Sequence, residues 1–373
     1  MVKLMHHSFH LEVYEKLREK LNKAPIGMPS SPSGVEREIL RLLFTEEEAS
    51  LALYMPFVPF TVEQLAERTG KSIEYLEKIL NEMAKKGTVW KGSRDGSVAY
   101  RLFPVMVGLF EMHFLPGPGN DPLQPKLAPL LAKYFREAFY KELGDRKHPI
   151  MRALPERDTI SPKARILPYE DAVKLVKERD YHAVGYCGCR IISRFIGEGC
   201  RRSLENCLHL GSLAKYMVEH GFAKRITADE ALSILKKANK EGLVHTTERS
   251  QGPISTICNC CSDCCVFFRT IYEARYPYAI AHSSYVARVD TERCLACGIC
   301  MLRCPMKAIM VKKDREPAKV NVERCLGCGV CVPTCPVEAL ELIPREELPE
   351  VPDRRTYVVQ LLSDRGKDFS ALL

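Results

Sequence analysis

Hydrophobic residues recur at helical spacing through the first third of the chain. Val13, Leu17 and Leu21 fall on one stripe and predict a short amphipathic helix over 9–22. Proline and serine then dominate up to residue 34, which is typical of a linker. We therefore expect residues 1–34 to form a helix and a linker ahead of the first domain.

A helical pattern that ends in a hairpin follows the linker. Helices are expected over 35–53, over 61–70 behind a capping-box sequence, and over 72–87. Alternating residues around an Asp-Gly turn predict a β-hairpin over 88–101. This order of elements predicts a winged-helix-like module over 35–105.

The charge of this module bears on whether it binds DNA. Residues 35–105 hold 10 Lys and Arg against 11 Asp and Glu, although the whole chain has a net charge of +8. Glu74 and Glu77 occupy the first half of the third helix, which a DNA reader would place against the phosphates. The basic residues near the hairpin are Lys85, Lys86, Lys91 and Arg94. The charges favour a structural or protein-interaction module over a DNA-binding one.

The middle of the chain changes from a proline-rich segment to an α/β pattern. Residues 106–165 are interpreted as a connector with one helix near 128–143, and His113 and His148 there as satisfied or exposed histidines. An α/β domain is expected over 166–281. Its predicted elements are helices at 169–179, 204–220 and 227–241 and a strand at 181–186.

Two copies of one cysteine pattern lie near the C-terminus. Each copy reads Cys-x2-Cys-x2-Cys-x3-Cys-Pro, and the second follows the first by 31 residues. Over roughly 285–345 the sequence resembles a bacterial-type ferredoxin with two [4Fe–4S] clusters, so a ferredoxin-like domain is expected over 282–345 and a tail with a strand near 357–362 after it. Four-cysteine zinc sites are the alternative that this repeated spacing disfavours.

The resemblance implies that the fourth cysteine of each copy ligates the cluster of the other copy. One cluster would be held by Cys294, Cys297, Cys300 and Cys335. The other would be held by Cys325, Cys328, Cys331 and Cys304. The proline after each fourth cysteine ends any helix and directs its sulfur away.

Nine further cysteines lie in the middle domain, and adjacent cysteines cannot easily ligate the same iron. They are either buried thiols with one zinc site, or they hold at least one further iron–sulfur cluster, which is the interpretation the ferredoxin motifs favour. The candidate ligands are Cys187, Cys189, Cys200, Cys207, Cys258, Cys260, Cys261, Cys264 and Cys265.

Composition and cysteine usage indicate the setting. Seventeen cysteines cannot all be paired, and such clusters in a reducing compartment indicate metal or redox chemistry. No apolar run reaches the ~18–20 residues of a membrane span, and the first ten residues lack the apolar region of a secretory signal. We expect a cytoplasmic protein from a well-reduced, anaerobic setting.

The order of motifs over 35–345 is similar to a group of prokaryotic, mostly anaerobic dicluster [4Fe–4S] proteins. The resemblance implies a multidomain α+β protein that transfers electrons to or from a partner redox protein or oxidoreductase subunit. One alternative is an enzyme with its site at the middle cysteines, and another is a redox-sensing DNA-binding regulator. No catalytic residue can be assigned, and the polar candidates near the cysteines are His182, Arg190, His209 and His245.

Overall fold

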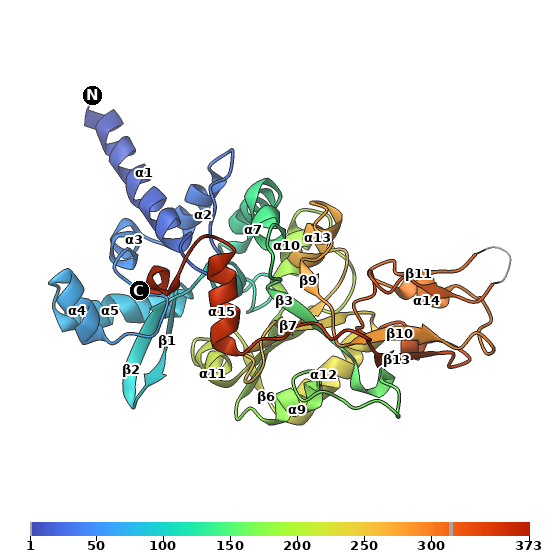
Figure 1. The fold of residues 1–373 in the computed structure, drawn as a ribbon. Helices are drawn as coiled ribbons and strands as arrows, with labels where there is room; N and C mark the ends of the chain where they lie inside the picture. Colours follow the sequence, from blue (N-terminus) through green and yellow to red (C-terminus); the bar gives the residue numbers. More distant parts are fainter. Residues whose placement is uncertain (1, 313–315) are drawn as a thin grey trace.

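The computed structural model describes residues 2–312 and 316–373, with side chains described from residue 12 onward. The chain is a mixed α/β multidomain fold. N-terminal helices and a C-terminal lobe flank a seven-stranded sheet, and the lobe projects from the body (Figure 1). Among the described residues, no helix combines the length and apolarity that a bilayer crossing requires.

The N-terminal part contains five helices and a hairpin, as the hydrophobic pattern predicts, except that the helix expected over 35–53 is two. Thr45 and Glu48 form a capping box that starts a new helix after extended Phe44: Thr45 N donates to Glu48 Oε2 at 2.8 Å, and Glu48 N donates to Thr45 Oγ1 at 3.2 Å. The elements are α1 (Val2–Leu21), α2 (Val35–Leu43), α3 (Glu46–Ala52), α4 (Val62–Thr69), α5 (Ile73–Lys86), β1 (Val89–Arg94) and β2 (Ser97–Leu102).

The N-terminal helices pack directly on the sheet domain. Tyr216 Oη donates a buried hydrogen bond to Ala84 O at 2.8 Å, and the rings of Phe103 and Tyr216 lie 5.5 Å apart between centroids. Tyr216 belongs to α11 (Gly211–Glu219) and Ala84 to α5. The module is therefore joined to the body through a buried interface.

The proline-rich segment contributes both a helix and a strand. The helix predicted near 128–143 is confirmed: α7 (Gln124–Tyr134) runs through one wide turn into α8 (Tyr140–Gly144). The strand β3 (Met151–Leu154) was not expected, and it pairs with two other strands of the main sheet. The sheet thus draws one of its strands from before residue 166.

The central sheet has the strand order β6-β4-β5-β8-β7-β3-β9. Neighbouring strands are antiparallel except for β3 and β9. The strand predicted at 181–186 is confirmed as β4, and the helix predicted at 227–241 is α12. The remaining elements are β4 (His182–Tyr186), β5 (Glu205–Leu210), β6 (Lys224–Ile226), β7 (Val244–Glu248), β8 (Thr256–Cys260), β9 (Ile280–Ala281), α9 (Ala172–Lys177) and α12 (Ala228–Lys240).

The two faces of the sheet differ in character. Figure 1 shows α9 and α12 on one side and α7, α10 (Gly188–Phe195) and α13 (Val266–Tyr272) on the other. Leu208 and Ile257 belong to the apolar cluster under α9 and α12. Because side chains alternate along a strand, their neighbours Cys207 and Cys258 face the opposite side. Cysteines are thereby gathered on one face.

The helix predicted over 204–220 is wrong in its first half. Residues 205–210 are the strand β5, and the helix α11 begins only at Gly211, whose φ is +62°. The helix predicted over 169–179 is likewise shorter, beginning at Ala172 behind the Asp171 cap. The last three residues of β5, Leu208, His209 and Leu210, are all buried, so the strand does not show the simple alternation of apolar and polar residues that would distinguish it from a helix.

The C-terminal lobe comprises the described residues of 282–345. The two cysteine repeats fold alike, each giving a ligand loop, a short helical turn and a strand. Its elements are β10 (Tyr285–Val289), α14 (Ile299–Arg303), β11 (Ile309–Met310), β12 (Lys319–Val320), a 3-10 turn (Val332–Thr334) and β13 (Leu340–Pro344).

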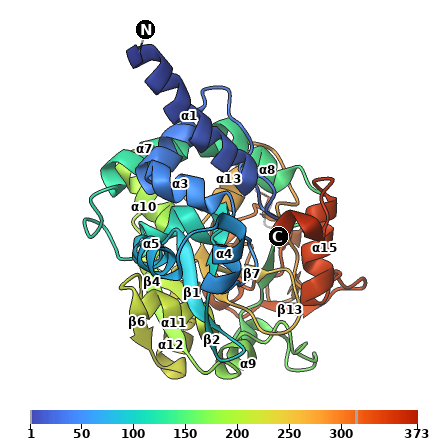
Figure 2. The same cartoon turned by 90° about the vertical axis from the view of Figure 1, so that its left-hand side faces the viewer.

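The strand predicted at 357–362 is wrong, because the tail forms the helix α15 (Arg354–Ser363). The Asp353 side chain accepts hydrogen bonds from the amides of Arg355 and Thr356 and so fixes the start of the helix. Tyr357 Oη then donates to Ile150 O at 3.0 Å. Figure 2 shows the C-terminus returning to the N-terminal helices beside α4.

Candidate metal centres

The first repeat of the lobe forms a cavity that includes a cysteine from the second. Cys294, Cys297 and Cys300 line it, and Cys335 lines it as well. Two backbone amides donate to these sulfurs: Ala318 N to Cys294 Sγ at 3.4 Å and Ala339 N to Cys335 Sγ at 3.2 Å. N–H donors stabilise thiolates that carry metal. We call these four cysteines the outer site.

The second repeat gathers a cysteine from the first in the same way. Burial raises the pKa of Cys331 above its ordinary value, and the charges of Cys328, Cys325 and Cys304 raise it further. Burial, with the charges of Cys325 and Cys304, also raises the pKa of Cys328 to about 12. The charge of Cys304 thus acts on both Cys328 and Cys331, and that of Cys325 acts on Cys304, so Cys304 is within electrostatic range of the second repeat's sulfurs. We call Cys304, Cys325, Cys328 and Cys331 the inner site.

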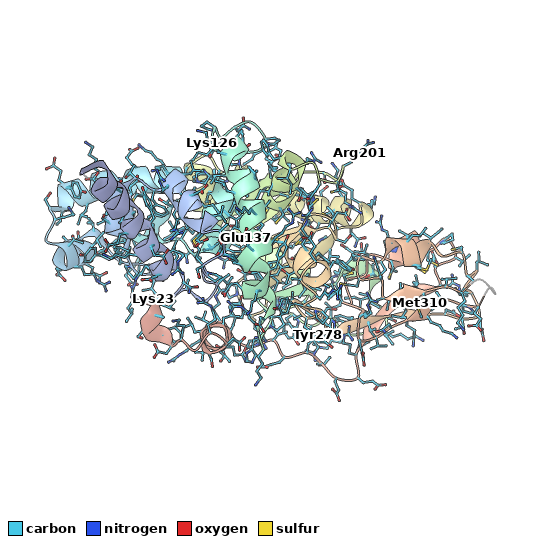
Figure 3. All side chains as sticks on the ribbon, turned by 90° about the horizontal axis from the view of Figure 1, so that it is seen from above. Lys23, Lys126, Glu137, Arg201, Tyr278 and Met310 are labelled. Carbon is cyan, nitrogen blue, oxygen red and sulfur yellow. The ribbon has the colours of Figure 1, made fainter. Side chains whose placement is uncertain are left out.

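The outer site lies at the surface. Cys297 is exposed, and the side chains of Leu295 and Leu302 around it are 64% and 85% exposed. Figure 3 shows Met310 on the same projecting lobe, far from the N-terminal helices. The outer site is therefore the part of the lobe that another protein can approach.

The inner site, in contrast, is held against the body. Glu156 N donates to Cys328 O at 3.3 Å, and Ser161 N donates to Leu342 O of the lobe at 2.8 Å. Within the lobe, Ser283 Oγ donates to Gly327 O at 2.8 Å. Gly327 has a φ of +69°, and a Cβ there would meet the backbone of Tyr285 at 2.0 Å, so only glycine allows this contact.

A second cavity lies on the cysteine face of the central sheet. Seven of the nine middle-domain cysteines line it: Cys261, and six others that act on one another's pKa in one contiguous series. Apolar side chains from distant segments, among them Phe110 and Phe267, also line it. In the order of the series, the six are Cys187, Cys189, Cys265, Cys260, Cys258 and Cys207. We call this the middle cavity.

A buried arginine compensates the sulfur charges of the middle cavity. Arg190 is fully buried, and its Nη1 donates to Ser203 O at 2.6 Å and to Asn206 Oδ1 at 2.9 Å. Burial alone would lower the pKa of Arg190, but the charges of Cys187 and Cys261 outweigh it and raise the pKa. A buried cation at this position would stabilise an anionic group in the cavity.

Two acid–base side chains also line the middle cavity. Burial raises the pKa of Glu111 to about 8 and lowers the pKa of His209 to about 4. Both groups are therefore neutral near pH 7. Sequence analysis named His209 and Arg190 but missed Glu111, because nothing in the connector's sequence links it to cysteines that follow 76 or more residues later.

The other histidine candidates lie outside the cavity lining. His182 Nε2 bonds to Val176 O at 2.8 Å, and His245 lies behind the cavity between Asn259 and Glu156. The two connector histidines have partners, as predicted: His113 pairs with Asp121 and His148 with Asp364.

Cys261, which also lines the middle cavity, forms a second group with Cys200 and Cys264, which do not line it. The sulfurs of Cys200, Cys261 and Cys264 all lie within 4.8 Å of one another, with Cys200 Sγ 3.8 Å from Cys261 Sγ. Cys200 N donates to Cys264 Sγ at 3.4 Å. We call this group the cysteine trio.

Comparison with known proteins identifies the class of the C-terminal lobe. Residues 287–342 match the family model of the 4Fe-4S dicluster domain. No curated protein and no solved structure matches the chain significantly. The chain thus carries a C-terminal 4Fe–4S dicluster domain, and this domain, together with the many cysteines, indicates iron–sulfur electron transfer.

Proposed function

We propose that the protein transfers single electrons between a partner redox protein and its own middle domain through two [4Fe–4S] clusters. The exchange of the fourth cysteines carries this proposal: Cys335 lines the cavity of the first repeat, and the charge of Cys304 acts on Cys328 and Cys331 of the second. Two groups of four thiolates suit two cubanes.

The positions of the two sites indicate the path of the electrons through the lobe. The outer site, around exposed Cys297, is the point of exchange with the partner. The inner site, whose loop accepts a hydrogen bond from Glu156 N of the body at Cys328 O, connects to the middle domain. The partner is a redox protein or an oxidoreductase subunit that approaches the outer site.

The middle cavity is the place we assign to a further iron–sulfur cluster. It offers seven sulfurs where a cubane needs four, apolar side chains from several segments, and the buried cation Arg190. Redox titration of the anaerobically purified chain, followed by EPR, tests the proposal. Three separable iron–sulfur signals are expected, and a chain without any cluster signal contradicts electron transfer.

A second candidate function is an enzyme that works at the middle cavity. The neutral carboxyl of Glu111 and the imidazole of His209 line the same cavity as the six cysteines, so a proton donor and acceptor stand beside the proposed cluster. A cluster signal from the middle cavity that changes on adding a small molecule would favour this function. Electron transfer remains the first proposal because the match of the lobe to the dicluster domain supports it.

We interpret the N-terminal part as a winged-helix-like module with a structural role. Glu74 and Glu77 are exposed on the first half of α5, where phosphate contact would require basic residues. The opposite end of α5 is occupied by the buried contact between Ala84 and Tyr216. A gel shift at low salt tests the regulator alternative, for which this proposal predicts no complex.

The cytoplasm is the location we propose. The metal centres that we propose need cysteines that remain reduced thiolates. A reducing compartment such as the cytoplasm keeps them in that state.

A further inference from the structure

We infer that the cysteine trio binds a single zinc ion beside the proposed iron–sulfur centre of the middle cavity, at whose wall Cys261 lies. A tetrahedral zinc site has Zn–S bonds of about 2.3 Å, which hold its sulfurs about 3.8 Å apart. Cys200 Sγ and Cys261 Sγ are 3.8 Å apart, and Cys264 Sγ lies within 4.8 Å of both. A cubane binds each thiolate on a different iron and so requires wider spacing.

Each of the two pairs of adjacent cysteines contributes one sulfur to each of the two proposed centres. Cys260 and Cys265 belong to the series in the middle cavity, whereas Cys261 and Cys264 belong to the trio. Neighbouring side chains at the end of a strand point to opposite sides. The sequence Cys-Cys-Ser-Asp-Cys-Cys at 260–265 therefore supplies ligands to two metals, two sulfurs to each.

The surroundings of the trio suit an anionic thiolate site. Three thiolates on Zn²⁺ leave a net charge of about −1. Arg202 lies near Cys200, where it pairs with Asp263, and Cys200 N already donates to Cys264 Sγ at 3.4 Å. Cys200 is only partly buried, so water completes the tetrahedron as the fourth ligand.

The proposed zinc site lies in the part of the body that contacts the lobe. Arg202 Nε donates to Glu241 O at 3.3 Å just after α12, and Arg303 Nη2 from the lobe donates to Asn239 O at 2.8 Å in the same helix end. Figure 3 shows Arg201, beside Cys200, extending outward from this loop. Zinc would hold this otherwise exposed loop to the turn after β8.

Metal analysis of the full chain, purified anaerobically, tests the inference. One zinc per chain is expected beside the iron. Cys200→Ser should lose the zinc and keep the iron, and the matched variant Cys258→Ser should keep the zinc and lose iron. Absence of zinc from the wild-type protein, or loss of iron rather than zinc in Cys200→Ser, would overturn the inference.

A measurement on the unaltered protein covers the case in which Cys200→Ser does not fold. X-ray absorption at the zinc edge should give sulfur neighbours at about 2.3 Å and no metal neighbour. A nearby iron scatterer would place the zinc in a cluster and contradict the inference. Because zinc and iron are counted separately, failure of the zinc site and failure of the proposed electron relay give different results.

Discussion

His245 Nε2 lies 3.1 Å from Glu156 Oε2, and this contact joins the middle cavity to the inner site. On one side, His245 Nδ1 is 2.6 Å from Oδ1 of Asn259, which lines the cavity. On the other, Glu156 N donates to Cys328 O at 3.3 Å. Three hydrogen bonds thus run between the two proposed centres.

Removing the Glu156 carboxylate should weaken this connection. Glu156→Ala leaves Nε2 of the buried His245 without its partner, which should cost about 1–3 kcal/mol of stability and slow electron equilibration between the inner and middle centres. Thermal unfolding and freeze-quench EPR measure the two effects. Glu156→Gln keeps an oxygen acceptor and is the control. Equal rates in Glu156→Ala and the wild-type protein would exclude this contact from the electron path.

The crossed grouping of the lobe's cysteines predicts opposite losses in two matched variants. Cys304→Ala should damage the inner cluster, whose other ligands lie at 325–331, although Cys304 follows the outer ligands in sequence. Cys335→Ala should damage the outer cluster. EPR of each variant during a redox titration measures which signal disappears. Loss of the outer signal in Cys304→Ala would contradict crossed ligation.

The exposed apolar rim of the outer site should matter for the partner and not for the clusters. Leu302→Asp should slow reduction by a protein donor, for which a reduced bacterial ferredoxin is the probe, and leave reduction by dithionite unchanged. Leu302 is 85% exposed, so little stability should be lost. Val98→Asp, at an exposed position of the hairpin, is the control. Equal slowing in both variants would remove the rim from the docking surface.

Many elements of the fold can be predicted from the sequence, because short local signals determine where they begin and end. The capping boxes at Thr61 and Thr227 start helices where the sequence predicts them. The helix at 354–363 was mistaken for a strand because Tyr357, Val358 and Val359 favour strands locally, while packing and the Asp353 cap favour a helix. The strand β3 carries no local signal, since its pairing with β7 joins residues about a hundred positions apart.

The same difference between local and long-range signals applies to the candidate sites. Regular spacing identified the eight cysteines of the lobe, since the ligands of each cluster lie mostly within one loop. The spacing of the other nine cysteines does not show which of them group together, because the fold, and not the local sequence, brings Cys200 next to Cys261. Glu111 was missed for the same reason: it reaches the cavity from a different segment.

The carboxyl of Glu111 predicts a pH dependence of stability. Its pKa is raised from 4.5 to about 8 by burial, so the folded protein holds this proton more tightly than the unfolded chain does. The stability that it contributes is complete below about pH 4.5 and is lost as the pH rises through about 8. Melting temperatures of the wild-type protein and Glu111→Gln, compared from pH 5 to 9, measure it.

The difference between the two melting curves is the informative quantity, because other groups titrate in both proteins. The wild-type protein should lose stability relative to Glu111→Gln as the pH rises. A difference that does not change with pH would show that Glu111 ionises normally.

Anaerobic analysis of iron and acid-labile sulfide tests the central claim most directly. Two clusters in the lobe and one in the middle cavity predict about twelve irons and about twelve sulfides per chain. About eight of each would confine the clusters to the lobe and contradict an iron–sulfur centre in the middle cavity. Iron without sulfide would contradict the cluster-based electron relay as a whole.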